Sequence, residues 1–266
     1  MAQRKLGSII VEPYDVAVAR GKIDFRTIWN KFGYNQSVPN STTEQIIAPW
    51  GGAFDPTTDI MTTDQTFTIT YDQTVDGAGT TGALSLMVIG VKTVDGVVVN
   101  FTQFHTLGNT GTDVTSFSGI GINRVNLISN GGLGWNAADI TFTATTDGTT
   151  QAEIPAEGSV TQQLIFHTQQ NYNFQATWVR FNVRKLSKGG SDIFYTVKGY
   201  SWSRVTLTRY EVFRENDDTG LSATTDIKPS EIFTIGGREV LYFTATSDTN
   251  STVVNGRFSG KEILNK

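Results

Sequence analysis

Residues 122–167 read INRVNLISNGGLGWNAADITFTATTDGTTQAEIPAEGSVTQQLIFH. Within this stretch Ile140, Phe142 and Ala144 alternate with threonines, and the apolar residues near its end repeat the same two-residue period. Alternation of this kind is typical of β-strands with one buried and one solvated face. The cluster PAEG at residues 155–158 interrupts the strands. Since Pro and Gly break strand pairing, this cluster predicts a boundary between two runs of strands.

Strand patterns continue before this stretch. Residues 67–71 alternate between apolar and polar side chains, and residues 83–93 are apolar on both sides. The second pattern predicts a central strand that is covered on both faces. Asp95 and Gly96 stand between that run and the next apolar run, and such a dipeptide is the strongest short-range signal for a β-hairpin.

Strand patterns also follow the boundary. Residues 175–186 and 192–200 flank Gly189 and Gly190, which predicts a second hairpin. Residues 215–218 read ENDD and predict an acidic loop. The many short strand candidates favour sandwiches or jelly rolls over alternating strands and helices.

Composition limits the classes of protein that fit. The 266 residues are 38% hydrophobic and 17% charged, and the length suits two β domains. The absence of cysteine excludes a disulfide framework, a thiolate nucleophile and a Cys-ligated metal. With no signal peptide and no apolar run of membrane-spanning length, we expect a soluble chain that begins near Met1. The net charge of −4 argues against a general nucleic-acid binder.

The first 60 residues differ from the rest in their weak periodicity and their many prolines and aromatic residues. The first 31 residues hold six basic and three acidic side chains, so a basic segment precedes an acidic body. This predicts an extended arm that lies on an acidic partner surface, with an ordinary solvated terminus as the alternative. Candidate contact residues of this arm are Arg20, Lys22, Phe25, Arg26, Trp29, Lys31, Phe32, Tyr34 and Trp50.

The sequence therefore predicts an all-β protein of two β-sandwich or jelly-roll-like domains preceded by an extended N-terminal arm. The arm is expected over residues 1–60, the first sandwich over 61–156 and the second over 157–266.

Reaction chemistry has little support in the sequence. His105 and His167 are the only imidazoles, G-x-S-x-G is absent, and neither histidine has further zinc ligands at short spacing. The glycine clusters near residues 119 and 131 lack a phosphate-loop pattern and predict turns. A calcium site at residues 215–218 lacks the EF-hand pattern. Distant carboxylate pairs stay open, but no motif singles one out. We expect no catalytic residue, no metal and no cofactor.

Exposed aromatic residues could serve binding. Trp135 lies in a glycine-rich loop, and Tyr200 and Trp202 follow the predicted second hairpin. These three residues are candidates for surface contact, either by stacking on sugars or by packing against a neighbouring subunit.

Several motifs carry a resemblance to a known family. They are WNKFGYN at residues 29–35, PWGG at 49–52, DGAGT at 76–80, INRV at 122–125 and VVNGRFSG at 253–260. In these motifs the chain resembles a family of virion structural proteins of marine tailed phages, especially phages of cyanobacteria and related aquatic bacteria. The similarity runs in order along nearly the whole chain. It departs from the family pattern at residues 166–171, FHTQQN, where an aromatic strand end and a Pro-Ala-Gly-like turn are expected.

The resemblance implies a capsid-associated decoration, cement or head-projection protein. It implies a homotrimer that contacts the phage major capsid protein or neighbouring virion proteins, located in the virion after assembly in the host cytoplasm. Nucleic acid and membrane are not expected partners. The alternatives are a tail or fibre component that contacts host glycans, a double jelly-roll capsid protein and, more remotely, an unrelated carbohydrate-active enzyme.

Overall fold

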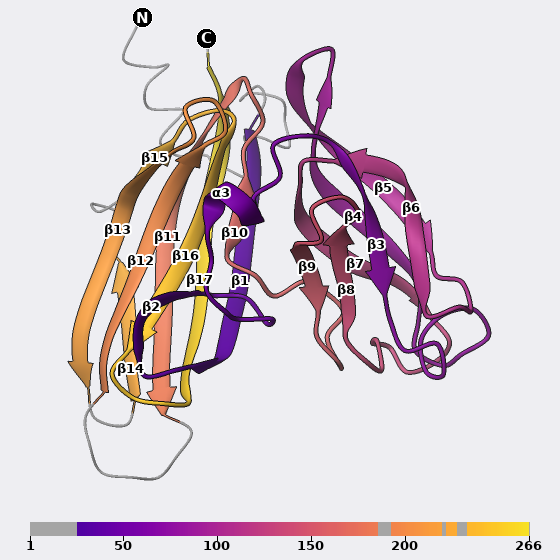
Figure 1. The fold of residues 1–266 in the computed structure, drawn as a ribbon, viewed down its shortest axis with the longest axis horizontal. Coiled ribbons are helices and arrows are strands. Elements are labelled where there is room, and N and C mark those ends of the chain that lie inside the picture. The colour runs from indigo at the N-terminus through magenta and orange to yellow at the C-terminus, as the bar shows by residue number, and fades with distance from the viewer. Residues whose placement is uncertain (1–25, 186–192, 220–221, 228–232, 266) are drawn as a thin grey trace, which may run out of the picture.

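The computed structural model describes residues 26–185, 193–219, 222–227 and 233–265. These residues form β-strands and one short helix, α3 (Pro56–Asp59), whose first turn is capped by Asp55. The strands form two sandwiches that lie side by side, as Figure 1 shows. The prediction of an all-β fold built from sandwiches is confirmed.

The larger sandwich is assembled from both ends of the described chain. Its first sheet has the order β1-β17-β11-β14 and its second the order β10-β16-β12-β13. Its strands are β1 (Arg26–Val38), β10 (Ile165–His167), β11 (Tyr172–Lys185), β12 (Ile193–Ser203), β13 (Thr208–Thr219), β14 (Ser222–Ile227), β16 (Glu239–Ser247) and β17 (Thr252–Leu264), with β2 (Ser41–Ile46) and β15 (Thr234–Ile235) beside them.

The order of these strands is that of a jelly roll. Numbered one to eight along the chain, the principal strands of this sandwich follow the orders 1-8-3-6 and 2-7-4-5. The first strand pairs with the last and the second with the seventh, which is the nested pairing that two interlocked Greek keys produce. We call this sandwich the jelly roll.

The jelly-roll core is rich in aromatic rings. Phe166 lies at its centre, with ring centroids 5.1 Å from Trp29, 4.6 Å from Phe174 and 6.5 Å from Phe258. Tilted and edge-to-face rings at such distances contribute beyond the apolar area they bury. The two sheets are therefore joined by interlocking rings.

The smaller sandwich is inserted between the first and second strands of the jelly roll, and we call it the inserted sandwich. Its sheets have the orders β6-β3-β8-β9 and β5-β4-β7. Its strands are β3 (Gln65–Thr70), β4 (Ala83–Val94), β5 (Val97–Thr106), β6 (Thr112–Gly119), β7 (Gly121–Asn130), β8 (Ile140–Ala144) and β9 (Thr150–Ile154). Numbered one to seven along the chain, these strands follow the orders 4-1-6-7 and 3-2-5, which is not the nested order of the jelly roll, so the double jelly-roll alternative is wrong.

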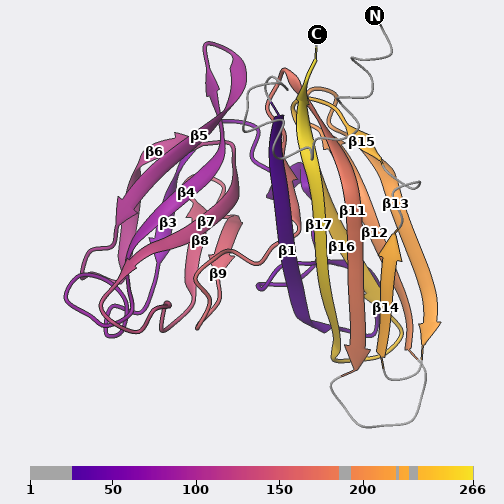
Figure 2. The same ribbon diagram turned by 180° about the vertical axis from the view of Figure 1, so that it is seen from behind.

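The expectation of an extended arm over residues 1–60 is wrong for the part that the structure describes. β1 pairs with β17 from Arg26 opposite Ile263 to Val38 opposite Thr252. Trp29 is only 6% exposed, so this segment belongs to the jelly roll itself. Figure 2 shows β1 beside β17 at the front of that domain. Residues 1–25 lie outside the described residues.

The first predicted hairpin is confirmed and the second is wrong. β4 is the central strand of its sheet and pairs with β5 through a turn at Asp95 and Gly96, both of which have positive φ. β11 and β12, in contrast, belong to opposite sheets of the jelly roll. β11 and β12 therefore form no hairpin, although strand patterns alone do not separate the two cases. Residues 215–218 lie in β13 and form no loop.

Candidate functional site

The two histidines occupy different structural settings. His105 Nε2 lies 3.3 Å from Asp113 Oδ2, and the same carboxylate accepts hydrogen bonds from Tyr71 and from the Gly108 amide. His167 is buried, and its Nδ1 accepts from Arg204 at 2.6 Å. Burial, with the nearby Arg204 and Lys31, holds the pKa of His167 well below its ordinary value, so the ring is neutral. In the described part of the chain, no group of three or more His, Cys, Asp or Glu residues could hold a metal ion.

His167 belongs to a polar seam between the two sandwiches. Asn123 of β7 donates to the His167 carbonyl at 2.9 Å and accepts from the His167 amide at 2.7 Å. Arg204 reaches across to the Met61 and Ile120 carbonyls at 3.1 and 2.9 Å. Because these groups are buried and hydrogen-bonded, the seam fixes the sandwiches against each other.

Lys31, expected as a contact of the arm, is part of this seam. It is 4% exposed and donates from Nζ to the Asn123 carbonyl. Burial, followed by repulsion from Arg124, lowers the pKa of Lys31 well below its ordinary value. The sequence analysis expected Lys31 to contact a partner surface, but its side chain points into the protein's own interior.

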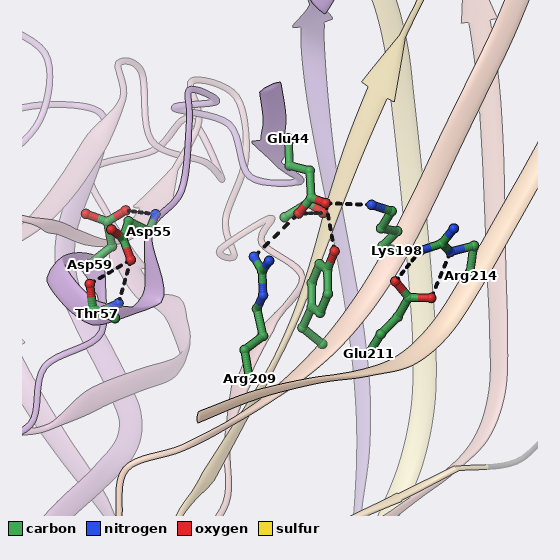
Figure 3. A network of polar contacts seen from close by, with 10 residues as sticks. Glu44, Asp55, Thr57, Asp59, Lys198, Arg209, Glu211 and Arg214 are labelled. Carbon is green, nitrogen blue, oxygen red and sulfur yellow. Dashed lines mark hydrogen bonds and ion pairs between the residues drawn. The ribbon is translucent and has the colours of Figure 1, made fainter. Parts of the chain in front are cut away.

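A second polar cluster joins β2 to the face of the jelly roll. Glu44 accepts from the Tyr200 hydroxyl at 2.7 Å. It also accepts from Lys198 Nζ at 2.8 Å, and Arg209 lies 3.8 Å away; Figure 3 shows Lys198 and Arg209 beside Glu44. Partial burial opposes ionisation of Glu44, but the hydrogen bonds from Lys198 and Tyr200 outweigh it and lower the pKa of Glu44. These contacts lie within one chain and hold β2 in place.

A groove on the outer face of the first jelly-roll sheet has the composition of a binding site. It lies over β1, β17 and β11, encloses about 500 Å³ and has Gln162 as a wall. The β-strand alternation turns Asn30, Phe32 and Tyr34 outward, while their odd-numbered neighbours Trp29 and Lys31 are buried. Its lining residues are Asn30, Lys31, Phe32, Gly33, Tyr34, Gln162, Trp178, Arg180, Asn182, Asn255, Gly256, Arg257 and Phe258.

The structure separates the candidate contact residues of the sequence into three groups. Phe32 and Tyr34 line the groove, and Trp135 is 44% exposed on the inserted sandwich. Trp29 is buried, with its indole N–H donating to Glu262 at 2.8 Å, and Trp50 is partly buried against the cluster of Ile46 and Tyr242. Arg20, Lys22 and Phe25 lie outside the described residues, as does the side chain of Arg26.

Tyr200 and Trp202 were expected at the surface, and that expectation is wrong. They are 4% and 1% exposed, in a cluster with Ile46 and Tyr242. Both therefore belong to the core, in the cluster that also buries Ala48 and Ile60. The sequence missed Trp178 and Arg257, whose shared surface forms only when β11 and β17 pair.

Comparisons with known proteins do not assign the chain. No family model matches it. No curated protein matches it. A solved structure of the Gx strain of infectious bursal disease virus is 9% identical, over 91% of this chain and 81% of that one, with a TM-score of 0.16. The VP2 subviral particle of the same virus is 8% identical over 91% and 82%, with a TM-score of 0.13. Similarity this weak carries no conclusion about fold or function.

Proposed function

We propose that this chain is a non-enzymatic structural component of a viral particle. The observation that supports it best is the jelly-roll strand order, an architecture that viral capsid domains share with lectins and cupins. Since a fold alone does not imply a function, the surfaces must support the proposal as well.

The inserted sandwich carries surfaces suited to contact with neighbours. Large apolar side chains are exposed on its strands and on one loop: Phe104 is 65% exposed, Val114 59%, Ile128 48% and Trp135 44%. Exposed apolar residues of this size favour burial in a protein interface. We propose that they contact neighbouring copies, most simply in a homotrimer, or the major capsid protein beneath.

The finer assignment is a decoration, cement or head-projection protein of a tailed phage, located in the virion after assembly in the host cytoplasm. The motif resemblance supports the phage assignment. No helix among the described residues is long and apolar enough to cross a membrane. A tail or fibre component that contacts glycans is the second candidate, and the groove over β1, β17 and β11 favours it.

Two measurements test this proposal. The copy number of the chain in purified particles should be in the hundreds for a shell component and about a dozen or fewer for a tail component. In solution, the full chain should have the mass of an oligomer. Phe104→Asp should lower that mass towards the mass of a monomer. Phe194→Asp, at a 57% exposed site on the jelly roll, is the matched control. A chain that is absent from particles and monomeric at high concentration contradicts the proposal.

A further inference from the structure

The floor of the groove over β1, β17 and β11 is a regular grid of outward side chains. Strand pairing sets three rows across the sheet, each with one residue from β1, β17 and β11. The rows are Asn30–Ser259–Trp178, Phe32–Arg257–Arg180 and Tyr34–Asn255–Asn182. At the rise of a β-strand these rows extend over roughly 14 Å. The grid is rigid because each backbone is part of a sheet.

Aromatic rings lie at both edges of the grid. Phe32 is 39% exposed, Tyr34 and Trp178 are half-buried, and all three line the groove. The face of an aromatic ring carries partial negative charge and attracts the positively polarised C–H groups of a saturated ring. These side chains suit a ligand with flat C–H faces, such as a pyranose.

Arg257 is the exposed cation at the centre of the grid. Its guanidinium carbon lies 5.8 Å from the centroid of the Trp178 ring, and its strand position is directly opposite Phe32. A guanidinium beside an aromatic ring keeps its planar N–H groups available for a carboxylate. None of the described residues that line the groove is acidic, so its charge attracts anions although the whole chain carries −4.

Amide side chains complete the lining. Asn30, Asn255 and Gln162 each offer a carbonyl acceptor and an N–H₂ donor. Hydroxyl groups both donate and accept, so rows of amides suit a ligand rich in hydroxyls. The volume of about 500 Å³ lies within the range of small-molecule sites.

We propose that this groove binds a carboxylated oligosaccharide, which stacks pyranose rings on Trp178 and Phe32 and places one carboxylate on Arg257. The inference does not depend on where the chain sits in a particle. A single-stranded nucleic acid would also stack on the rings, but its phosphates need cations along the whole track. The outer rows of the grid offer amides, hydroxyls and rings in place of cations.

The experiment is calorimetric titration of the full chain with tetragalacturonate, with its methyl ester as the uncharged analogue of the same sugar. We expect binding of the acid and roughly tenfold weaker binding of the ester, because the ester forms no ion pair with Arg257. Arg257→Gln should weaken binding of the acid by roughly tenfold and leave binding of the ester unchanged. Trp178→Ala should weaken both ligands.

Matched variants separate the groove from the rest of the surface. Trp135→Ala removes an exposed indole from the inserted sandwich, and Arg214→Gln removes an exposed arginine from β13. Both should bind tetragalacturonate like the unaltered chain. Absence of binding at millimolar ligand overturns the inference. The inference is also overturned if the control variants lose as much binding affinity as the groove variants do. Tighter binding of a single-stranded oligothymidylate that depends on Trp178 and Arg257 also overturns it, in favour of a nucleic-acid site. Particle copy number is unaffected by any of these results.

Discussion

The two sandwiches use the chain in different ways. The inserted sandwich takes all its strands from one continuous segment, from β3 to β9. The jelly roll pairs β1 with β17, so residues more than 200 positions apart form its edge. Its assembly therefore depends on contacts between the two ends of the chain, which are slow to form because long loops must close first. This difference indicates that the inserted sandwich is the unit that can fold independently.

The largest effect that tests this comparison is removal of β1. A chain that begins at Ser41 lacks the edge strand that carries Trp29 and Val38 into the jelly-roll core. We expect it to lose the protected amides of β11, β16 and β17 in hydrogen exchange, while those of β3, β4 and β8 stay protected. A chain that begins at Arg26 keeps every described strand and serves as the control.

The same comparison predicts that residues 62–158 fold alone. They contain both sheets of the inserted sandwich and its core around Phe67, Phe142 and Ile154. Circular dichroism and dispersed amide resonances would show a folded β domain. If this fragment is unfolded while the chain from Ser41 keeps its jelly roll, then the jelly roll, and not the inserted sandwich, is the unit that folds independently.

Sequence patterns identified much of the inserted sandwich because its buried residues are apolar. Ile140, Phe142 and Ala144 alternate with threonines, and all three are buried in β8. The turn at residues 95–96 was equally clear, since the backbone there requires positive φ.

The same patterns failed for β1 and for the groove. The inward row of β1 includes Lys31, Gly33 and Asn35, so no apolar alternation marks the strand. Lys31 lies in the seam, Gly33 lies against the backbone of residues 163–164, and Asn35 donates to the Ile46 carbonyl. The groove joins residues from three strands that become neighbours only through the jelly-roll order. Phe32 and Tyr34 were candidate contact residues and line the groove, but Trp178 and Arg257 could not be placed beside them from spacing alone.

Single substitutions in the two hydrophobic cores should have a smaller effect, and each should act on its own sandwich. Phe166 and Phe142 are both fully buried, one in each sandwich. Replacement of either by Ala should cost about 3–5 kcal/mol of unfolding free energy, through lost burial and the cavity left behind. Hydrogen exchange should show the loss in the jelly roll for Phe166→Ala and in the inserted sandwich for Phe142→Ala. Equal loosening of both sandwiches by each variant would show that they unfold as a single unit.

A single side chain tests how the two sandwiches are joined. Asn123→Ala removes both hydrogen bonds to the backbone of His167 and leaves a buried N–H and a buried carbonyl without these partners. We expect a loss of about 2–4 kcal/mol and faster proteolysis between the sandwiches. Asn126→Ala, at a half-buried position of the same strand, is the control. Unchanged stability in Asn123→Ala would show that the apolar contacts alone hold the seam.

The smallest effect concerns Glu153, which lies in β9 next to the boundary between the sandwiches. Burial, with repulsion from Asp139, raises the pKa of Glu153 to about 7. In the unfolded chain this carboxyl titrates near 4.3. Between these values the folded protein binds more protons, so its stability falls as pH rises through this window. The ionised form of Glu153 is the unfavourable one, because its charge is partly buried and is repelled by Asp139. Its charge also acts on Tyr34, whose pKa is raised by burial and by Glu153.

Glu153→Gln should therefore stabilise the protein at pH 8 and change little at pH 4. We expect a gain of about 1 kcal/mol at pH 8, because solvent screens a half-exposed carboxylate and reduces the effect of its shifted pKa. Urea unfolding of both proteins at the two pH values measures it. Glu157→Gln removes the same charge from an exposed position four residues away and serves as the control. If Glu153→Gln is equally stabilising at both pH values, the gain comes from packing and the titration of Glu153 has no part in it.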